Sequence, residues 1–251
     1  MFNLFVPNRL SHAILLTCLA ASHAVQAQEK MFTLEEVIVT AQKRSQNIQD
    51  VPISVSAVSG AKIADAGIST MDDLSRYVPN LNISTGNNTQ IRMRGLGSGL
   101  NKGFEQSVGM YIDGIYFGRD RSYRGSLLDL SRVEVLRGPQ GILFGKNTIA
   151  GAINMGTAKP SQEFEGEVGL TYGSHGERKI LGVISGLLSD TLSGRLVFSD
   201  DSGDGYVDNS LSDVDGAETD NRTYRATLLW EPNSDLSASL KLEKGDFKRR
   251  G

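Results

Sequence analysis

The sequence predicts an α+β domain followed by antiparallel strands of a transmembrane β-barrel that the chain leaves incomplete. Between Val51 and Pro160, short helix signals are mixed with strand signals and Gly-, Asn- and Pro-rich turns, which is typical of a compact mixed domain. After Phe164, apolar and polar residues alternate and tight turns alternate with long loops, which is typical of a membrane barrel. A soluble β-sandwich, whose strands also alternate, is the alternative that periodicity leaves open.

Composition and the N-terminus narrow the class of protein. The 251 residues carry a net charge of −3, which gives no general reason to bind nucleic acid. The first 27 residues read as a secretory signal peptide, with Arg9, an apolar run at Ala13–Ala21 and a small-residue cleavage pattern at Val25–Ala27. Its removal would take away the only cysteine, Cys18, and leave His175 as the only histidine. We therefore expect an exported protein without thiol nucleophiles or Cys/His metal sites.

Two helices and four strands are expected in the α+β domain. Ser59 predicts the start of a helix that continues to Ala66, and Thr70 with Asp73 resembles the capping box of a second helix. The second helix should end just before Pro79, because the residue before a proline disfavours helical geometry. The strands are expected at Ile91–Arg94, Val108–Ile112, Val133–Leu136 and Ala152–Thr157.

Five further strands are expected after Phe164, each about as long as the roughly 9–11 residues of a tilted membrane strand. They are Glu165–Tyr172, Lys179–Leu188, Leu192–Ser199, Arg222–Glu231 and Leu236–Glu243. An open sheet in lipid leaves backbone groups unsatisfied, and closed membrane barrels begin at about eight strands. We therefore expect a truncated chain, either by nature or as a partial sequence.

Two features point to binding. Glu36–Ala41 is a β-branched run behind a polar leader, and it reads either as the first strand of the domain or as a peptide that adds to a partner's sheet edge. The loops Leu96–Gln106 and Tyr116–Arg124 follow predicted strands, and the second is rich in tyrosine and arginine. That mixture suits stacking on, and neutralising, an anionic ligand.

Four segments together resemble the TonB-dependent outer-membrane receptors. Leu34–Ala41 (LEEVIVTA) is similar to the TonB box of that family. Ile91–Gly95 (IRMRG) and Tyr111–Tyr116 (YIDGIY) are similar to motifs of its plug domain. Asp129–Pro160 is a nearly unbroken match to the plug signature, apart from Ala150, where a glycine is common.

The resemblance implies a plug with a mixed four-stranded sheet inside a barrel of the 22-stranded type. The expected divisions are a signal peptide (1–27), a periplasmic leader (28–50) with the TonB box (34–41), a plug (51–160) and about five first barrel strands (161–251). Neither a catalytic residue, a cofactor nor a resident metal is expected.

The resemblance also implies three groups of site residues. The expected TonB contacts are Glu36, Val37, Ile38, Val39 and Thr40. The candidates for ion pairs with acidic barrel residues are Arg94, Arg137 and Lys146. The ligand-facing residues of the plug loops are expected to be Asn101, Lys102, Phe104, Tyr116, Phe117, Arg119, Arg121 and Tyr123.

The implied function is uptake of a scarce nutrient, such as a ferric siderophore or another iron complex, across the outer membrane of a Gram-negative bacterium. The implied partners are TonB with its inner-membrane energy-coupling proteins, outer-membrane lipid and the nutrient, and nucleic acid is not among them. The short stretch from Gln28 to Leu34 leaves no room for an extra periplasmic signalling domain. A non-transporting fragment and a periplasmic TonB-binding plug module are the alternatives.

Overall fold

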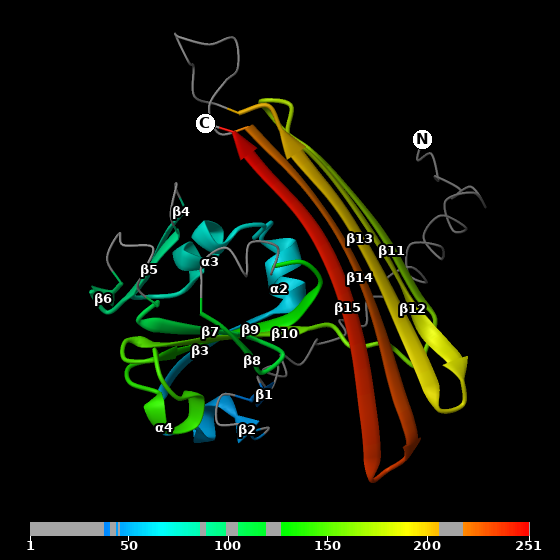
Figure 1. Ribbon diagram of the computed structural model, residues 1–251, viewed down its shortest axis with the longest axis horizontal. Helices are drawn as coiled ribbons and strands as arrows, with labels where there is room; N and C mark the ends of the chain where they lie inside the picture. The colour runs from blue at the N-terminus through cyan, green and yellow to red at the C-terminus, as the bar shows by residue number, and fades with distance from the viewer. Residues whose placement is uncertain are drawn as a thin grey trace, which may run out of the picture. The chain divides into compact units, whose positions relative to one another are not determined.

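The computed structural model describes residues 38–40, 44, 46–85, 89–98, 105–118, 127–205 and 218–250. In these ranges the chain forms a two-stranded, a three-stranded and two five-stranded sheets (Figure 1). No helix within them is long and apolar enough to cross a membrane. The strands of the α+β domain and the C-terminal strands thus belong to different sheets. This arrangement confirms the predicted fold class.

The first five-stranded sheet, here called the central sheet, has the strand order β3-β9-β10-β7-β8. Its strands are β3 (Ser54–Ser59), β7 (Val108–Ile112), β8 (Ile115–Phe117), β9 (Leu130–Arg137) and β10 (Gly151–Thr157). Strand β10 is parallel to β7 and antiparallel to β9. The expectation of four strands was wrong, because Asp113 and Gly114 adopt positive φ angles and turn β8 back onto β7.

A separate three-stranded sheet contains β4 (Leu81–Thr85), β5 (Thr89–Met93) and β6 (Leu96–Gly97). The strand expected around Ile91 is therefore β5, which does not join the central sheet. Its place there is taken by β3, which the sequence analysis missed because its serines blur the alternation of apolar residues.

The helices are short, and their starts follow the predicted caps. They are η1 (Ile48–Asp50), α2 (Gly60–Asp65), α3 (Met71–Tyr77) and α4 (Gly141–Phe144). The Ser59 hydroxyl accepts from the Lys62 backbone N–H, and Thr70 with Asp73 forms a complete capping box. Both cap predictions are confirmed, and α4 was not predicted.

Each face of the central sheet carries its own apolar cluster, because successive side chains of a strand point to opposite faces. Val135 and Ile153 contribute to the cluster that contains residues of α2 and α3. Their neighbours Leu136 and Ala152 contribute to a second cluster, which contains Val39. Val39 of the N-terminal segment therefore packs on one face of this sheet.

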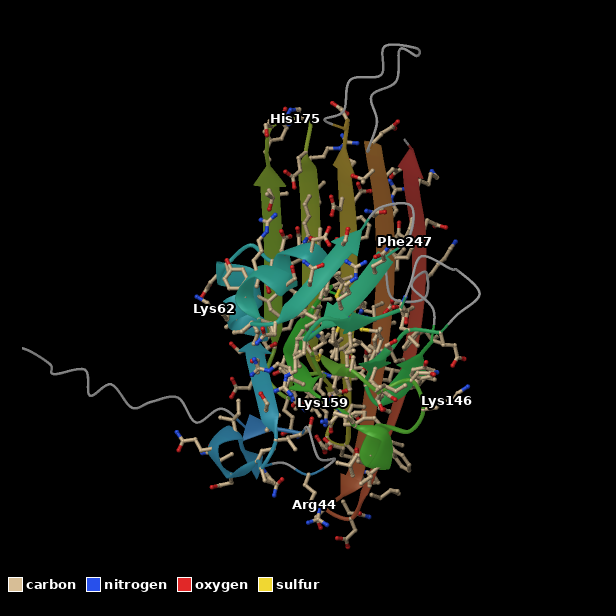
Figure 2. All side chains as sticks on the ribbon, turned by 90° about the vertical axis from the view of Figure 1, so that its left-hand side faces the viewer. Arg44, Lys62, Lys146, Lys159, His175 and Phe247 are labelled. Carbon is tan, nitrogen blue, oxygen red and sulfur yellow. The ribbon has the colours of Figure 1, made fainter. Side chains whose placement is uncertain are left out.

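The second five-stranded sheet, here called the C-terminal sheet, has its strands antiparallel and in chain order (Figure 1). They are β11 (Glu165–Tyr172), β12 (Arg178–Ser189), β13 (Leu192–Gly203), β14 (Glu218–Asn233) and β15 (Leu236–Arg250). Strands β13 and β14 extend into the predicted loop Asp200–Asn221, because their ladder continues as far as the pair of Gly203 and Thr219. The side chains of Asp200 and Arg222, which are opposite each other in this ladder, form an ion pair at 2.7 Å. His175 is exposed at the turn between β11 and β12 (Figure 2).

The two faces of the C-terminal sheet differ in polarity. One face exposes large apolar side chains, including Val168, Leu170, Leu196, Leu228, Leu240 and Leu242. The other buries polar ones, namely Ser185, Ser193, Arg195, Ser199, Thr223, Arg225 and Thr227. An apolar outer face and a polar inner face are what a membrane strand requires.

Cations from the polar face contact the α+β domain along a line that we call the seam. Arg195 donates two hydrogen bonds to Asp129, from Nε at 2.8 Å and from Nη2 at 2.6 Å. Arg225 donates to the backbone oxygen of Leu128 at 2.8 Å, and Lys241 pairs with Asp113. The seam therefore joins three consecutive strands to residues that lie just before β9 and between β7 and β8.

We predict that Asp129→Ala lowers the free energy of unfolding by about 3 kcal/mol, because it leaves the buried Arg195 guanidinium without its bidentate partner. Adding Arg195→Met should recover most of this loss, because both charges are then gone. Urea unfolding of the single and double variants measures the effect. The exposed pair Lys146–Glu105 supplies the control, since Lys146→Met should cost under about 1 kcal/mol. Equal effects of Asp129→Ala and Lys146→Met would contradict the assignment.

Asp113 makes stability depend on acid pH. Burial by itself would raise the pKa of Asp113, but hydrogen bonds from Lys241 and Thr157 outweigh it and bring this pKa below its ordinary value. The stabilisation is then complete above the unfolded pKa of about 4 and is lost as pH falls through the lowered folded pKa. Between wild type and Asp113→Asn, the difference in free energy of unfolding should be constant near neutral pH and shrink in acid. A difference that stays constant in acid would contradict this.

Candidate functional site

Part of the expected TonB-contact segment forms a strand in the structure. Ile38 and Val39 make up β1, which pairs antiparallel with β2 (Gln46–Asn47). Among the described residues the ladder has two residue pairs, Ile38 with Asn47 and Val39 with Gln46. Glu36 and Val37 lie outside the described residues. A ladder this short contributes little on its own, so side-chain contacts must hold the segment.

Val39 provides the apolar part of these contacts. Its side chain is 0% exposed and belongs to the cluster that also contains Val51, Leu136 and Ala152. Burying a valine side chain stabilises by about 2 kcal/mol. Removing the segment from the domain would therefore expose both Val39 and the apolar surface beneath it.

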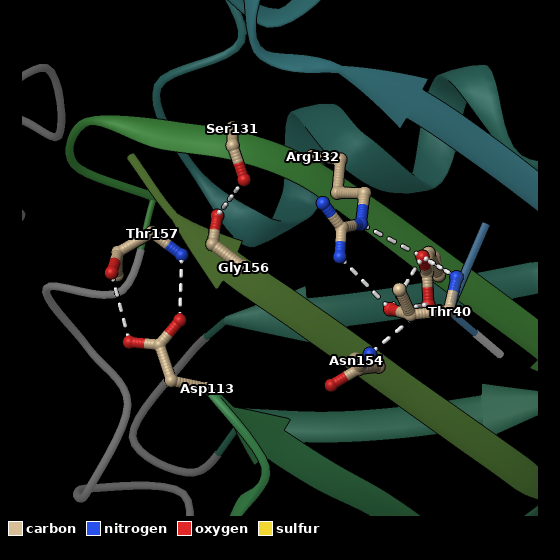
Figure 3. Close-up of polar contacts among 8 residues, drawn as sticks. Thr40, Asp113, Ser131, Arg132, Asn154, Gly156 and Thr157 are labelled. Carbon is tan, nitrogen blue, oxygen red and sulfur yellow. Dashed lines mark hydrogen bonds and ion pairs between the residues drawn. The ribbon is translucent and has the colours of Figure 1, made fainter. Parts of the chain in front are cut away.

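Thr40 provides the polar part. Its backbone N–H donates to Oε1 of Glu134 at 2.6 Å, and its hydroxyl donates to the same oxygen at 3.0 Å (Figure 3). Glu134 lies on β9, 94 residues further along the chain, and its side chain is fully buried. A buried carboxylate is costly unless donors satisfy it, and Thr40 supplies two of them.

The remaining donors to Glu134 come from the central sheet. Arg132 donates from Nε to Oε1 at 2.9 Å, and Asn154 on β10 donates from Nδ2 to Oε2 at 3.0 Å. Arg132 also donates from Nη2 to the Thr40 hydroxyl oxygen at 2.9 Å. We call Thr40, Arg132, Glu134 and Asn154 the Glu134 cluster. Its hydrogen bonds hold Thr40 against β9, and we call the contact of Thr40 with Glu134 a clasp.

The sequence analysis missed Glu134, Arg132 and Asn154. One signal was available, because Glu134 is a carboxylate between Val133 and Val135 in the expected strand Val133–Leu136. A charged residue in such a place needs a partner. Its partner Thr40 is distant in sequence, so the pairing itself could not be read from spacing.

Two of the expected ligand-facing residues are described, and both lie on β8. The Tyr116 hydroxyl accepts from Asn147 Nδ2 at 2.8 Å, and the Tyr116 ring lies 5.4 Å from that of Tyr111. Phe117 packs against the cluster next to α2 and α3. The other expected residues fall outside the described ranges, namely Asn101, Lys102, Phe104, Arg119, Arg121 and Tyr123.

The three expected ion-pair residues make contacts within the α+β domain. Lys146 lies at its surface (Figure 2) and pairs with Glu105 at 3.3 Å. Arg137 donates to the backbone oxygen of Pro79 at 3.3 Å, while Arg94 forms the turn after β5 with a φ of 53°. In the part of the chain that the structure describes, no salt bridge joins these three to the C-terminal sheet. The seam there has the opposite polarity, with the cations on the strands.

Comparisons with known proteins identify the domain. Residues 47–152 match the family model of the TonB-dependent receptor plug domain. The pesticin receptor of Yersinia enterocolitica is 34% identical over 153 residues, covering 59% of this chain and 22% of that protein. The vitamin B12 transporter of Vibrio vulnificus is 26% identical over 212 residues, covering 81% of this chain and 33% of that protein.

A solved structure extends the similarity to the C-terminal sheet. The ferric yersiniabactin uptake receptor of Yersinia pestis matches with a TM-score of 0.69 and 27% identity, covering 77% of this chain and 32% of that one. The chain thus spans between 22% and 33% of the length of these relatives. It belongs to the TonB-dependent receptors of the Gram-negative outer membrane, and it carries their plug domain followed by five antiparallel strands.

Proposed function

We propose that this chain is part of a receptor that imports a scarce nutrient, energised through TonB. No covalent bond is made or broken in such a step, so the proposed activity is transport and not catalysis. Glu36–Thr40 is the proposed TonB contact, and outer-membrane lipid surrounds the apolar face of the C-terminal sheet. The observation that carries the proposal is a strand-forming segment that is held by a two-pair ladder and one polar clasp.

A segment held in this way is suited to exchange partners. Leaving β2 breaks the short ladder of Ile38 and Val39, and the same main-chain groups can then add to an exposed sheet edge of TonB. Main-chain hydrogen bonds would give the affinity, and the β-branched side chains favour the extended conformation. Once the segment is bound, force from TonB would reach the plug through the covalent chain that follows Thr40.

An iron complex, such as a ferric siderophore, is the proposed cargo. One relative is named for ferric yersiniabactin uptake and another for vitamin B12 transport, so the choice of an iron complex is the finer part of the proposal. The proposed ligand-facing loops carry Lys102, Arg119 and Arg121 among aromatic residues, which suits an anionic chelate.

Arg94 and Arg137 remain proposed partners of acidic barrel residues. Arg137 supports this, because its Nε atom is buried and has no hydrogen-bond partner among the described residues. A buried guanidinium N–H without an acceptor is unfavourable, so a carboxylate from another part of the receptor would satisfy it.

We predict that Val37→Pro abolishes energised uptake by the full-length receptor while surface binding of the cargo stays intact. Proline lacks the N–H group that strand addition to TonB requires. Uptake and binding of radiolabelled iron complexes by whole cells measure the two steps separately. Val37→Ala is the control, because it shortens the side chain but keeps the donor and should retain most uptake. Normal uptake by the proline variant would refute the TonB-contact assignment.

A further inference from the structure

We propose that Glu134 is the positioning residue that holds the TonB-contact segment on the plug, and that the segment becomes available to TonB only when Thr40 leaves this carboxylate. This inference rests on the proposed function and adds to it the group that controls availability of the segment. Nothing else on the plug offers Thr40 a comparable pair of contacts in the described residues, since its N–H and hydroxyl both donate to Glu134.

Glu134 is buried on an inner strand of the central sheet, where a carboxylate needs hydrogen-bond donors. Glu134 is 0% exposed and lies on β9, between β3 and β10 in the central sheet. In the register of the sheet, it faces Ala57 on β3 and Asn154 on β10. A carboxylate that is buried in this way needs donors, and the docked Thr40 supplies two of them. The carboxylate therefore favours the docked segment.

The other members of the Glu134 cluster orient the carboxylate before Thr40 arrives. Asn154 holds Oε2, which leaves Oε1 directed at the N–H group of Thr40. Arg132 contacts both Oε1 and the Thr40 hydroxyl oxygen, so it closes the ring of contacts. A preorganised acceptor loses little conformational entropy on binding, which strengthens the contribution of Thr40 beside that of Val39.

A second threonine in the plug, outside the N-terminal segment, also donates both its N–H and its hydroxyl to one carboxylate group. The backbone N–H and the hydroxyl of Thr157 both donate to the Asp113 carboxylate, each at 2.8 Å (Figure 3). Thr157 ends β10 and lies opposite Leu130, so it is not part of the N-terminal segment. The chain thus offers a matched pair of sites: one threonine clasp on the segment and one on the body of the plug.

Availability of the segment can be measured directly in the purified full-length receptor. Val39→Cys places a thiol in a fully buried position, and without Cys18 of the signal peptide it is the only cysteine of this chain. The rate at which a polyethylene-glycol maleimide reacts with it reports opening of the segment. In this background, Thr40→Val removes the hydroxyl at nearly constant volume, and Glu134→Gln removes the carboxylate charge.

We expect each of these two variants to raise the rate about tenfold or more, as follows from losing a hydrogen bond to a charged group. Thr157→Val, the matched control, should leave the rate within about twofold of the parent, because it weakens an equal clasp elsewhere. Unchanged rates in both Thr40→Val and Glu134→Gln would overturn the proposal. An equal rise in Thr157→Val would also overturn it, because the plug would then be loosening as a whole. Thr40→Val keeps the carboxylate, so the test stands even if Glu134→Gln does not fold.

Binding of the periplasmic domain of TonB tests the proposed function separately. With Val39 restored, the Thr40→Val and Glu134→Gln receptors should bind this domain more tightly than the parent when no cargo is present. Raised maleimide rates without any TonB binding would refute the TonB contact and leave Glu134 as the residue that holds the segment. TonB binding with unaltered maleimide rates would refute the role of Glu134 and leave the proposed function standing.

Discussion

The central sheet has two apolar faces, and most of the plug is arranged by the need to cover both. Val135 and Ile153 point to one face, where residues of α2 and α3 pack against them. Leu136 and Ala152 point to the other, where Val39 from the N-terminal segment packs. The segment that we propose to be exchanged is therefore also a piece of the core. Its departure would uncover apolar surface, so in the proposed exchange TonB would have to supply work as well as an alternative strand.

The seam is independent of that segment. Its contacts to the C-terminal sheet involve Asp113, Leu128 and Asp129, none of which belongs to the cluster around Val39. Asp129 is held further, because its backbone oxygen accepts from Ala158, just beyond β10. Lifting the N-terminal segment therefore leaves the attachment of the plug to the strands intact. The two ends of the domain can respond to different forces.

The sequence predicted those parts of the fold that depend on residues close together in the chain. The caps of α2 and α3 and the alternation that predicted β11, β13, β14 and β15 are properties of neighbouring residues, and these elements were confirmed. Contacts between distant residues were not available from spacing. The clasp of Thr40 on Glu134 spans 94 residues, and the polarity of the seam depends on which strand residues face the plug. Arg195 and Arg225 gave a signal that went unused, since both lie on the face opposite the apolar residues.

The two threonine–carboxylate contacts differ in the strand that precedes each threonine. The contacts of Thr157 with Asp113 and of Thr40 with Glu134 use the same groups at similar distances. Thr157, however, ends a seven-residue strand that is hydrogen-bonded to β7 and to β9. Thr40 follows a two-residue strand that, in the part of the chain that the structure describes, pairs with β2 alone. Breaking the first clasp leaves its threonine in place, whereas after the second is broken the segment is retained by the short ladder and by the burial of Val39. A clasp therefore controls the position of a segment only where the ladder next to it is short.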